Sequence, residues 1–76
     1  MAEEKVEVYI REDMDVARRG WLVMKLEHEQ GIVSAWFADG NHHHLTVHYE
    51  REHFSHLTLL DAIKQLGFHG ELFQSG

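Results

Sequence analysis

The apolar residues of this chain follow two different periods in turn, and this alternation constrains the fold more than any other feature. Val6, Val8 and Ile10 occupy every second position, which is typical of a strand with one buried face. The pattern predicts a first strand over residues 5–11, with Tyr9 on the face opposite to the three aliphatic side chains.

A helix is predicted next, over residues 16–29. Either Asp13 or Asp15 can accept the free amide protons at its start, where a carboxylate also suits the helix dipole. Gly31 is expected to end the helical segment. The apolar side chains recur at spacings of three and four, as they do on a helix with one buried face; they include Val16, Ala17, Trp21, Val23, Met24 and Leu26.

The middle of the chain predicts a hairpin. Residues 32–38 read as a second strand, and the Asp-Gly-Asn sequence at 39–41 is a strong turn signal. Leu45, Val47 and Tyr49 then alternate with polar residues, which predicts a third strand antiparallel to the second.

Ser55 is a favourable N-cap for a second helix that ends at Gly67, and residues 68–73 are predicted as a short last strand. The order strand, helix, strand, strand, helix, strand predicts an α+β fold of the ferredoxin-like βαββαβ type, with two helices on one face of a four-stranded antiparallel sheet. We expect a single domain over residues 1–76. The apolar positions of the second helix are Leu59, Leu60, Ile63 and Leu66.

Charge and composition argue against several functions. Asp and Glu outnumber Lys and Arg by 13 to 7, giving a net charge of -6, which disfavours binding to nucleic-acid phosphates. There is no apolar run long enough to cross a bilayer and no signal-peptide pattern at the start, so we expect a soluble cytoplasmic protein. The serines lack a nucleophile-elbow sequence, and an enzyme is not expected.

Residues 59–68 read LLDAIKQLGF, and the pair Gly31-Ile32 precedes the second strand. Both features resemble the heavy-metal-associated domain, the fold of small copper chaperones and of the N-terminal domains of metal-pumping P-type ATPases. The first resembles the family's second helix with its Gly-aromatic ending, and the second its Gly-Val pair. The resemblance covers nearly the whole chain and implies the βαββαβ fold, with a role in metal handling or partner docking.

The chain departs from this family in the segment that binds metal. Family members carry a Met-x-Cys-x-x-Cys motif after the first strand, whereas this chain has Met14 followed by Val16 and Arg19 at the cysteine positions. Valine has no donor atom, and arginine does not lose its proton in proteins. Binding of Cu(I) by two thiolates is therefore not available, and the family's metal ligands cannot be carried over.

Histidine is the abundant donor instead, with eight histidines and no cysteine. His42 and His44 are separated by one residue, so in extended backbone they share a side and can chelate one ion, with His43 turned aside. An N/O ligand set suits Zn(II), Ni(II), Co(II) or Cu(II) rather than Cu(I). The alternative is a solvated polar hairpin tip. The candidate ligands at this end of the domain are His42, His44, His43, His69, Asp13 and Asp15.

Two further histidine-containing regions are open to interpretation. His28, His53 and His56 are expected at the opposite end, where a surface and capping role is the simpler explanation. The sheet face away from the helices is expected to hold aromatic side chains, which suggests a protein interface; the residues on it are Tyr9, Trp36, His48, Thr46 and possibly Phe73.

Two functional hypotheses follow. The first is a small metal-binding domain that uses histidine and carboxylate ligands for metal sensing, buffering or delivery. The second is a metal-free interaction module that keeps the fold and uses the open sheet face to dock a partner or to form homo-oligomers.

Overall fold

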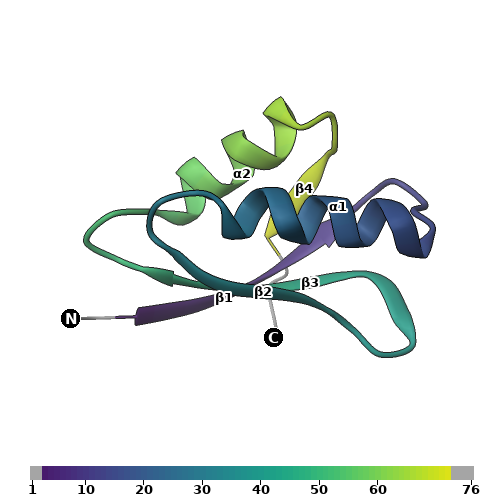
Figure 1. Ribbon diagram of the computed structural model, residues 1–76, viewed down its shortest axis with the longest axis horizontal. Helices are drawn as coiled ribbons and strands as arrows, with labels where there is room; N and C mark the ends of the chain where they lie inside the picture. The colour runs from purple at the N-terminus through teal and green to yellow at the C-terminus, as the bar shows by residue number, and fades with distance from the viewer. Residues whose placement is uncertain (1–2, 73–76) are drawn as a thin grey trace.

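The structure, a computed structural model, describes residues 3–72. The strands form a four-stranded antiparallel sheet in the order β2-β3-β1-β4, and both helices cover one face of it (Figure 1). The predicted ferredoxin-like α+β fold is thereby confirmed. The elements in chain order are β1 (Glu3–Ile10), α1 (Val16–Glu27), β2 (Ile32–Ala38), β3 (Asn41–Glu50), α2 (His56–Gln65) and β4 (Gly70–Leu72).

The hydrophobic core lies between the sheet and the helices. Alternate residues of the two central strands face it, as their period of two predicts. Each helix adds two fully buried side chains four residues apart, one turn along the same face. The fully buried residues are Val8, Ile10, Leu22, Leu26, Leu45, Val47, Leu59 and Ile63.

The buried stripe of α1 differs from the predicted one. The face toward the sheet is centred on Leu22 and Leu26, whereas Val16 is 75% exposed and Met24 49% exposed. Because successive helical residues are rotated by about 100°, a residue two positions from Leu22 lies on nearly the opposite side of the helix. The helix also ends at Glu27, earlier than predicted, and the positive φ of 100° at Gly31 leads the chain into β2.

Both predicted caps at the helix starts are present. Of the two aspartates that the sequence allowed, Asp15 is the N-cap of α1, and its Oδ1 accepts the Arg18 N–H at 2.8 Å. The Ser55 hydroxyl likewise accepts the Thr58 N–H at 3.2 Å at the start of α2. Each cap satisfies an amide that has no partner within its helix.

The hairpin turn is tighter than predicted, because β3 begins at Asn41 and leaves only Asp39 and Gly40 between the strands. The register then shifts: Phe37 is paired with Leu45, but Ala38 is paired with Asn41. The three consecutive histidines of β3, residues 42–44, therefore lie between two pairs whose partners on β2 are adjacent residues. A bulge of this kind changes the direction in which side chains point, compared with a regular strand.

The last strand, β4, pairs with the end of β1, with Ile10 opposite Gly70. A hydrogen bond of 2.9 Å from the Arg11 N–H to the His69 carbonyl continues this pairing beyond the strand ends. Residue 73, which was predicted to close the strand and to reach the open sheet face, lies outside the described residues.

Candidate metal centre

Three connecting segments lie toward one end of the domain: the loop between β1 and α1 and the β2–β3 hairpin, at the right of Figure 1, and the segment before β4, above them in the same view. Side-chain contacts join them. His43 of the hairpin lies 3.1 Å from Asp13 of the first loop, and His69 lies 2.5 Å from Glu12 of the same loop. This end of the domain therefore brings imidazole and carboxylate groups together in pairs.

Two contacts hold the ring of His43, and a third holds its backbone. Its Nδ1 lies 2.6 Å from the Ile10 carbonyl oxygen, and because a carbonyl only accepts, the proton of a neutral ring is on Nδ1. The ring also stacks on Tyr9, with centroids 5.3 Å apart and an interplanar angle of 22°. The backbone N–H of His43 donates to the Asn41 side chain at 3.0 Å. These contacts fix both the orientation and the tautomer of the imidazole.

This arrangement leaves Nε2 of His43 as the nitrogen that can bind a metal. A metal-binding histidine commonly donates its other ring N–H to a backbone carbonyl or a carboxylate, and that bond fixes its tautomer. Here Nε2 is 3.1 Å from Asp13 Oδ1. Two ligands on one tetrahedral zinc, at bond lengths of ~2.0 to 2.2 Å, lie ~3.3 Å apart. The spacing of the two atoms suits a shared ion as well as a shared proton.

His44 faces a different carboxylate. Its Nε2 lies 2.5 Å from Glu7 Oε1, and it sits opposite Tyr9 in the β1–β3 register. His48 makes the same diagonal pair further along the strands, with its Nε2 3.7 Å from Glu3. His42 is exposed in the bulge. The alternation that placed His42 and His44 on one side assumed a regular strand, and the register shift falls at this point.

His69 and Glu12 form a pair of their own, in which Glu12 accepts from the His69 backbone N–H at 2.8 Å and contacts Nδ1 at 2.5 Å. Burial raises the pKa of Glu12, but these hydrogen bonds outweigh it and hold that pKa below its usual value. Glu12 was not among the predicted ligands. In the sequence it resembles the other acidic residues, and only the fold brings it to His69.

The Met position and the two Cys positions of the Met-x-Cys-x-x-Cys motif carry no metal donor at the surface. The Met14 thioether is in the core and 5% exposed. Val16 is exposed, and the Arg19 guanidinium donates to the Met14 carbonyl at 2.6 Å. Asp15 is occupied as the α1 cap. The donors at this end therefore come from the hairpin and from the loop ahead of the motif.

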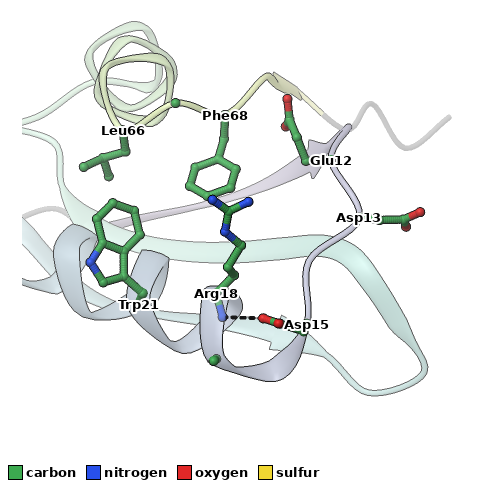
Figure 2. A pocket seen from close by; sticks show the side chains of 9 residues that line it. Glu12, Asp13, Asp15, Arg18, Trp21, Leu66 and Phe68 are labelled. Atoms are coloured by element: carbon green, nitrogen blue, oxygen red, sulfur yellow. Dashed lines mark hydrogen bonds between the residues drawn. The ribbon is translucent and has the colours of Figure 1, made fainter.

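A groove with a volume of about 870 Å³ adjoins Asp13 (Figure 2). Trp21 and Phe68 form one wall, with ring centroids 6.2 Å apart, and the Arg18 guanidinium lies 5.9 Å from the centre of the Phe68 ring. Figure 2 shows the Asp13 side chain pointing away from these aromatic rings. Glu12, Asp13 and Asp15 border the same groove and outnumber Arg18, so this end carries a negative field that favours cations.

Within residues 3–72, no group of three or more His, Asp or Glu side chains is arranged to hold one metal ion. Of the predicted ligands, His43 is paired with Asp13, whereas His44 and His69 are each paired with a glutamate. At the opposite end, His28 is the C-cap of α1, the His53 N–H donates to the Glu50 carbonyl at 3.0 Å, and His56 begins α2.

Two of the aromatic residues predicted for the open sheet face, Trp36 and Tyr9, are partly exposed. Trp36 is 45% exposed and Tyr9 is 38% exposed. Thr46 lies between Trp36 and Glu7 in the strand register and is buried. Val33, next to the irregular pairing of β2, is 48% exposed. Both Val33 and Trp36 are on β2, which is an edge strand.

No protein-family model matches this sequence, and no curated protein matches it. Solved structures with the same fold include oxidized MerP from Ralstonia metallidurans CH34, with a TM-score of 0.84, 14% identity, and coverage of 96% of this chain and 100% of that one. The yeast copper transporter domain CCC2A, solved in the apo and Cu(I)-loaded states, has a TM-score of 0.79, 16% identity, and coverage of 99% and 100%.

The N-terminal domain of a potential copper-translocating P-type ATPase from Bacillus subtilis, solved in the Cu(I)-loaded state, has a TM-score of 0.81, 24% identity, and coverage of 93% and 88%. At these identities the likeness establishes the fold, which is that of the heavy-metal-associated domains. In the described part of the chain, neither helix has the length and apolarity that a bilayer crossing requires.

Proposed function

We propose that this domain binds a divalent transition metal ion through imidazole and carboxylate groups, for metal sensing, buffering or delivery. The observation that carries the proposal is the His43 ring, whose Nδ1 is held by the Ile10 carbonyl while its Nε2 lies 3.1 Å from Asp13. His43 and Asp13 are the proposed ligands. Among the other candidates, His44 and His69 are engaged by Glu7 and Glu12, and Asp15 caps α1.

The donor types define the class of metal. A neutral imidazole nitrogen and a carboxylate oxygen suit Zn(II), Ni(II), Co(II) or Cu(II), whereas Cu(I) prefers the soft sulfur ligands that this end of the domain lacks at its surface. The solved structures of the same fold include domains described as copper-binding or Cu(I)-loaded, which supports a metal-related role for the fold. The proposed ligands differ from thiolates, so the metal is expected to differ too.

The test is a zinc and nickel titration of tag-free, metal-free protein by calorimetry. We expect His43→Ala and Asp13→Ala each to weaken binding by tenfold or more, on the order of the losses seen when metal-site residues are removed. Asp13 is the safer variant, since its side chain is fully exposed and its loss leaves the core unchanged. Circular dichroism verifies that both variants fold.

The matched comparison is the double variant His42→Ala/His44→Ala, which removes the pair that the sequence pattern favoured. The proposed ligands predict that this variant keeps most of the zinc affinity. Unchanged affinity in both His43→Ala and Asp13→Ala would refute the proposed site, and loss only in the double variant would move it to the pair favoured by the sequence.

A second candidate function is docking or self-association through the open sheet face without metal. It is favoured by Trp36 and Val33, which leave apolar surface on β2, because exposed aromatic clusters often mark interfaces. Sedimentation of metal-free protein, with Trp36→Ala as the variant and Trp21→Ala as the control on another surface, tests it. A wild type that stays monomeric at high concentration would rule out self-association through this face.

A further inference from the structure

We infer that the metal site is completed by a second copy of this chain, so that one ion is held by His43 and Asp13 of two copies in a symmetric dimer. The inference rests on the proposed function and adds to it a ligand set, a stoichiometry and a partner. Its basis is the number of donors that one copy can supply. Structural zinc sites have four protein ligands, and catalytic zinc sites have three with a water.

One copy supplies two donors at this place. His43 Nε2 and Asp13 Oδ1 are 3.1 Å apart, and within residues 3–72 no third His, Asp or Glu joins them to form a metal-binding group. Two protein ligands with the remaining positions left to water would give a weak site. The geometry of a single copy is therefore that of half a tetrahedral site.

The neighbouring donors are committed to other contacts within the same copy. His69 makes two contacts with Glu12, at 2.5 and 2.8 Å, and one of them involves its backbone N–H, so recruiting Glu12 or His69 would break a pair that joins the first loop to the segment before β4. His44 lies 2.5 Å from Glu7. Drawing either histidine to His43 would cost an existing charge-assisted contact.

The half-site is open on its outer side. The Asp13 side chain is fully exposed, and that of His43 is 26% exposed. Tyr9 and the Ile10 carbonyl support the inner side of the His43 ring, so a further ligand can approach only from solvent. A two-fold axis through the ion would place an identical half-site there, which is the simplest closed arrangement for two copies of one chain.

The charge of the domain makes this association depend on the metal. Each copy carries a net charge of -6, and the loop that supplies Asp13 also holds Glu12 and Asp15. Like charges facing each other oppose contact. A divalent cation bound between the two Asp13 carboxylates neutralises their mutual repulsion. The dimer through this end is therefore expected to form with metal and to separate without it.

The experiment combines zinc titration with sedimentation velocity on tag-free Trp36→Ala protein. This variant lacks the exposed tryptophan of the open sheet face, so association through that face does not obscure the result. The expected result is a monomer without metal, a dimer when zinc is added, saturation at one zinc per two chains, and return to monomer with a chelator. His43→Ala and Asp13→Ala should each abolish the zinc-induced dimer, whereas His42→Ala should retain it.

The possible failures are distinguishable. Saturation at one zinc per chain with a monomer throughout would overturn the bridged dimer while leaving the proposed metal function standing. The absence of any zinc or nickel binding would overturn both. A zinc-induced dimer that persists in His43→Ala and Asp13→Ala would show that the second copy completes a different site, and this inference would be wrong.

Discussion

The carboxylate of Glu27, the last residue of α1, accepts a hydrogen bond of 3.3 Å from the backbone N–H of Ala35 on β2. Because β2 is the edge strand beside β3 in the described sheet, this amide points to the edge of the sheet. The edge strand has the sequence IVSAWFA, without a charged residue or a proline, so it lacks the usual side-chain protection against pairing with another chain. Glu27 supplies part of that protection from the helix.

We therefore expect Glu27→Ala to destabilise the domain by about 1 kcal/mol, the typical contribution of one such hydrogen bond, and to increase self-association through β2. The control is Glu29→Ala, which removes the same charge from an exposed position just beyond the helix. Urea unfolding measures the stability, and light scattering on heating measures the association. Equal scattering from the two variants would show that Glu27 does not protect the edge.

Substitution of two glycines by alanine should have opposite effects. At Gly31 the φ is +100°, and an added Cβ would lie 3.0 Å from the His53 Cβ and 3.2 Å from the Phe54 Cβ, so we expect a loss of roughly 1–3 kcal/mol. Gly20 lies inside α1, and outside the backbone of its own helix no atom lies within 4 Å of the added Cβ, so its replacement should stabilise the domain by about 0.5–1 kcal/mol. Thermal unfolding of both variants measures the difference. A stabilised Gly31→Ala would contradict the close approach of this turn to residues 53 and 54.

The Glu12–His69 pair predicts a pH dependence. Burial raises the pKa of Glu12, but the hydrogen bonds from His69 dominate and lower it overall. A lowered pKa in the folded state means that the stabilisation is present above the unfolded pKa of about 4.3 and is lost as the pH falls through the folded value.

Glu12→Gln should therefore be less stable than the wild type near neutral pH, and the difference should shrink as the pH falls below the unfolded pKa of about 4.3. Urea unfolding at several pH values measures it, with Glu29→Gln as the control. A difference between wild type and Glu12→Gln that stays constant over this range would mean that the carboxylate of Glu12 gains nothing from His69.

Cu(I) should bind weakly, and its binding should not depend on Met14. The Met14 thioether is a soft donor, but it is 5% exposed and packs in the core. Met14→Leu should change stability by less than about 1.5 kcal/mol, as volume-conserving core substitutions do, and should leave Cu(I) affinity unchanged. Competition with a Cu(I) chelator measures that affinity. Tight one-to-one Cu(I) binding that is lost in Met14→Leu would show that the core opens to expose the sulfur.

The hydrophobic pattern determined which strand faces meet the helices. Val8, Ile10, Leu45 and Val47 are buried as their alternation predicts, because a shift of one residue would turn the whole set toward solvent. The same pattern was less decisive for α1. A broad stripe leaves several helical rotations open, and contact with the sheet selected the one that buries Leu22 and exposes Met24.

At the candidate site, the sequence determined which donors exist, and the tertiary structure decided which of them meet. The imidazole and carboxylate groups and the absence of cysteine are properties of the chain itself. The meeting of His43 with Asp13 depends on the bulge after Phe37 and on the Ile10 carbonyl, and the pairing of His44 with Glu7 depends on the register between β1 and β3. Register and bulges arise from contacts between residues far apart in sequence, so a local alternation of histidines could not reveal them.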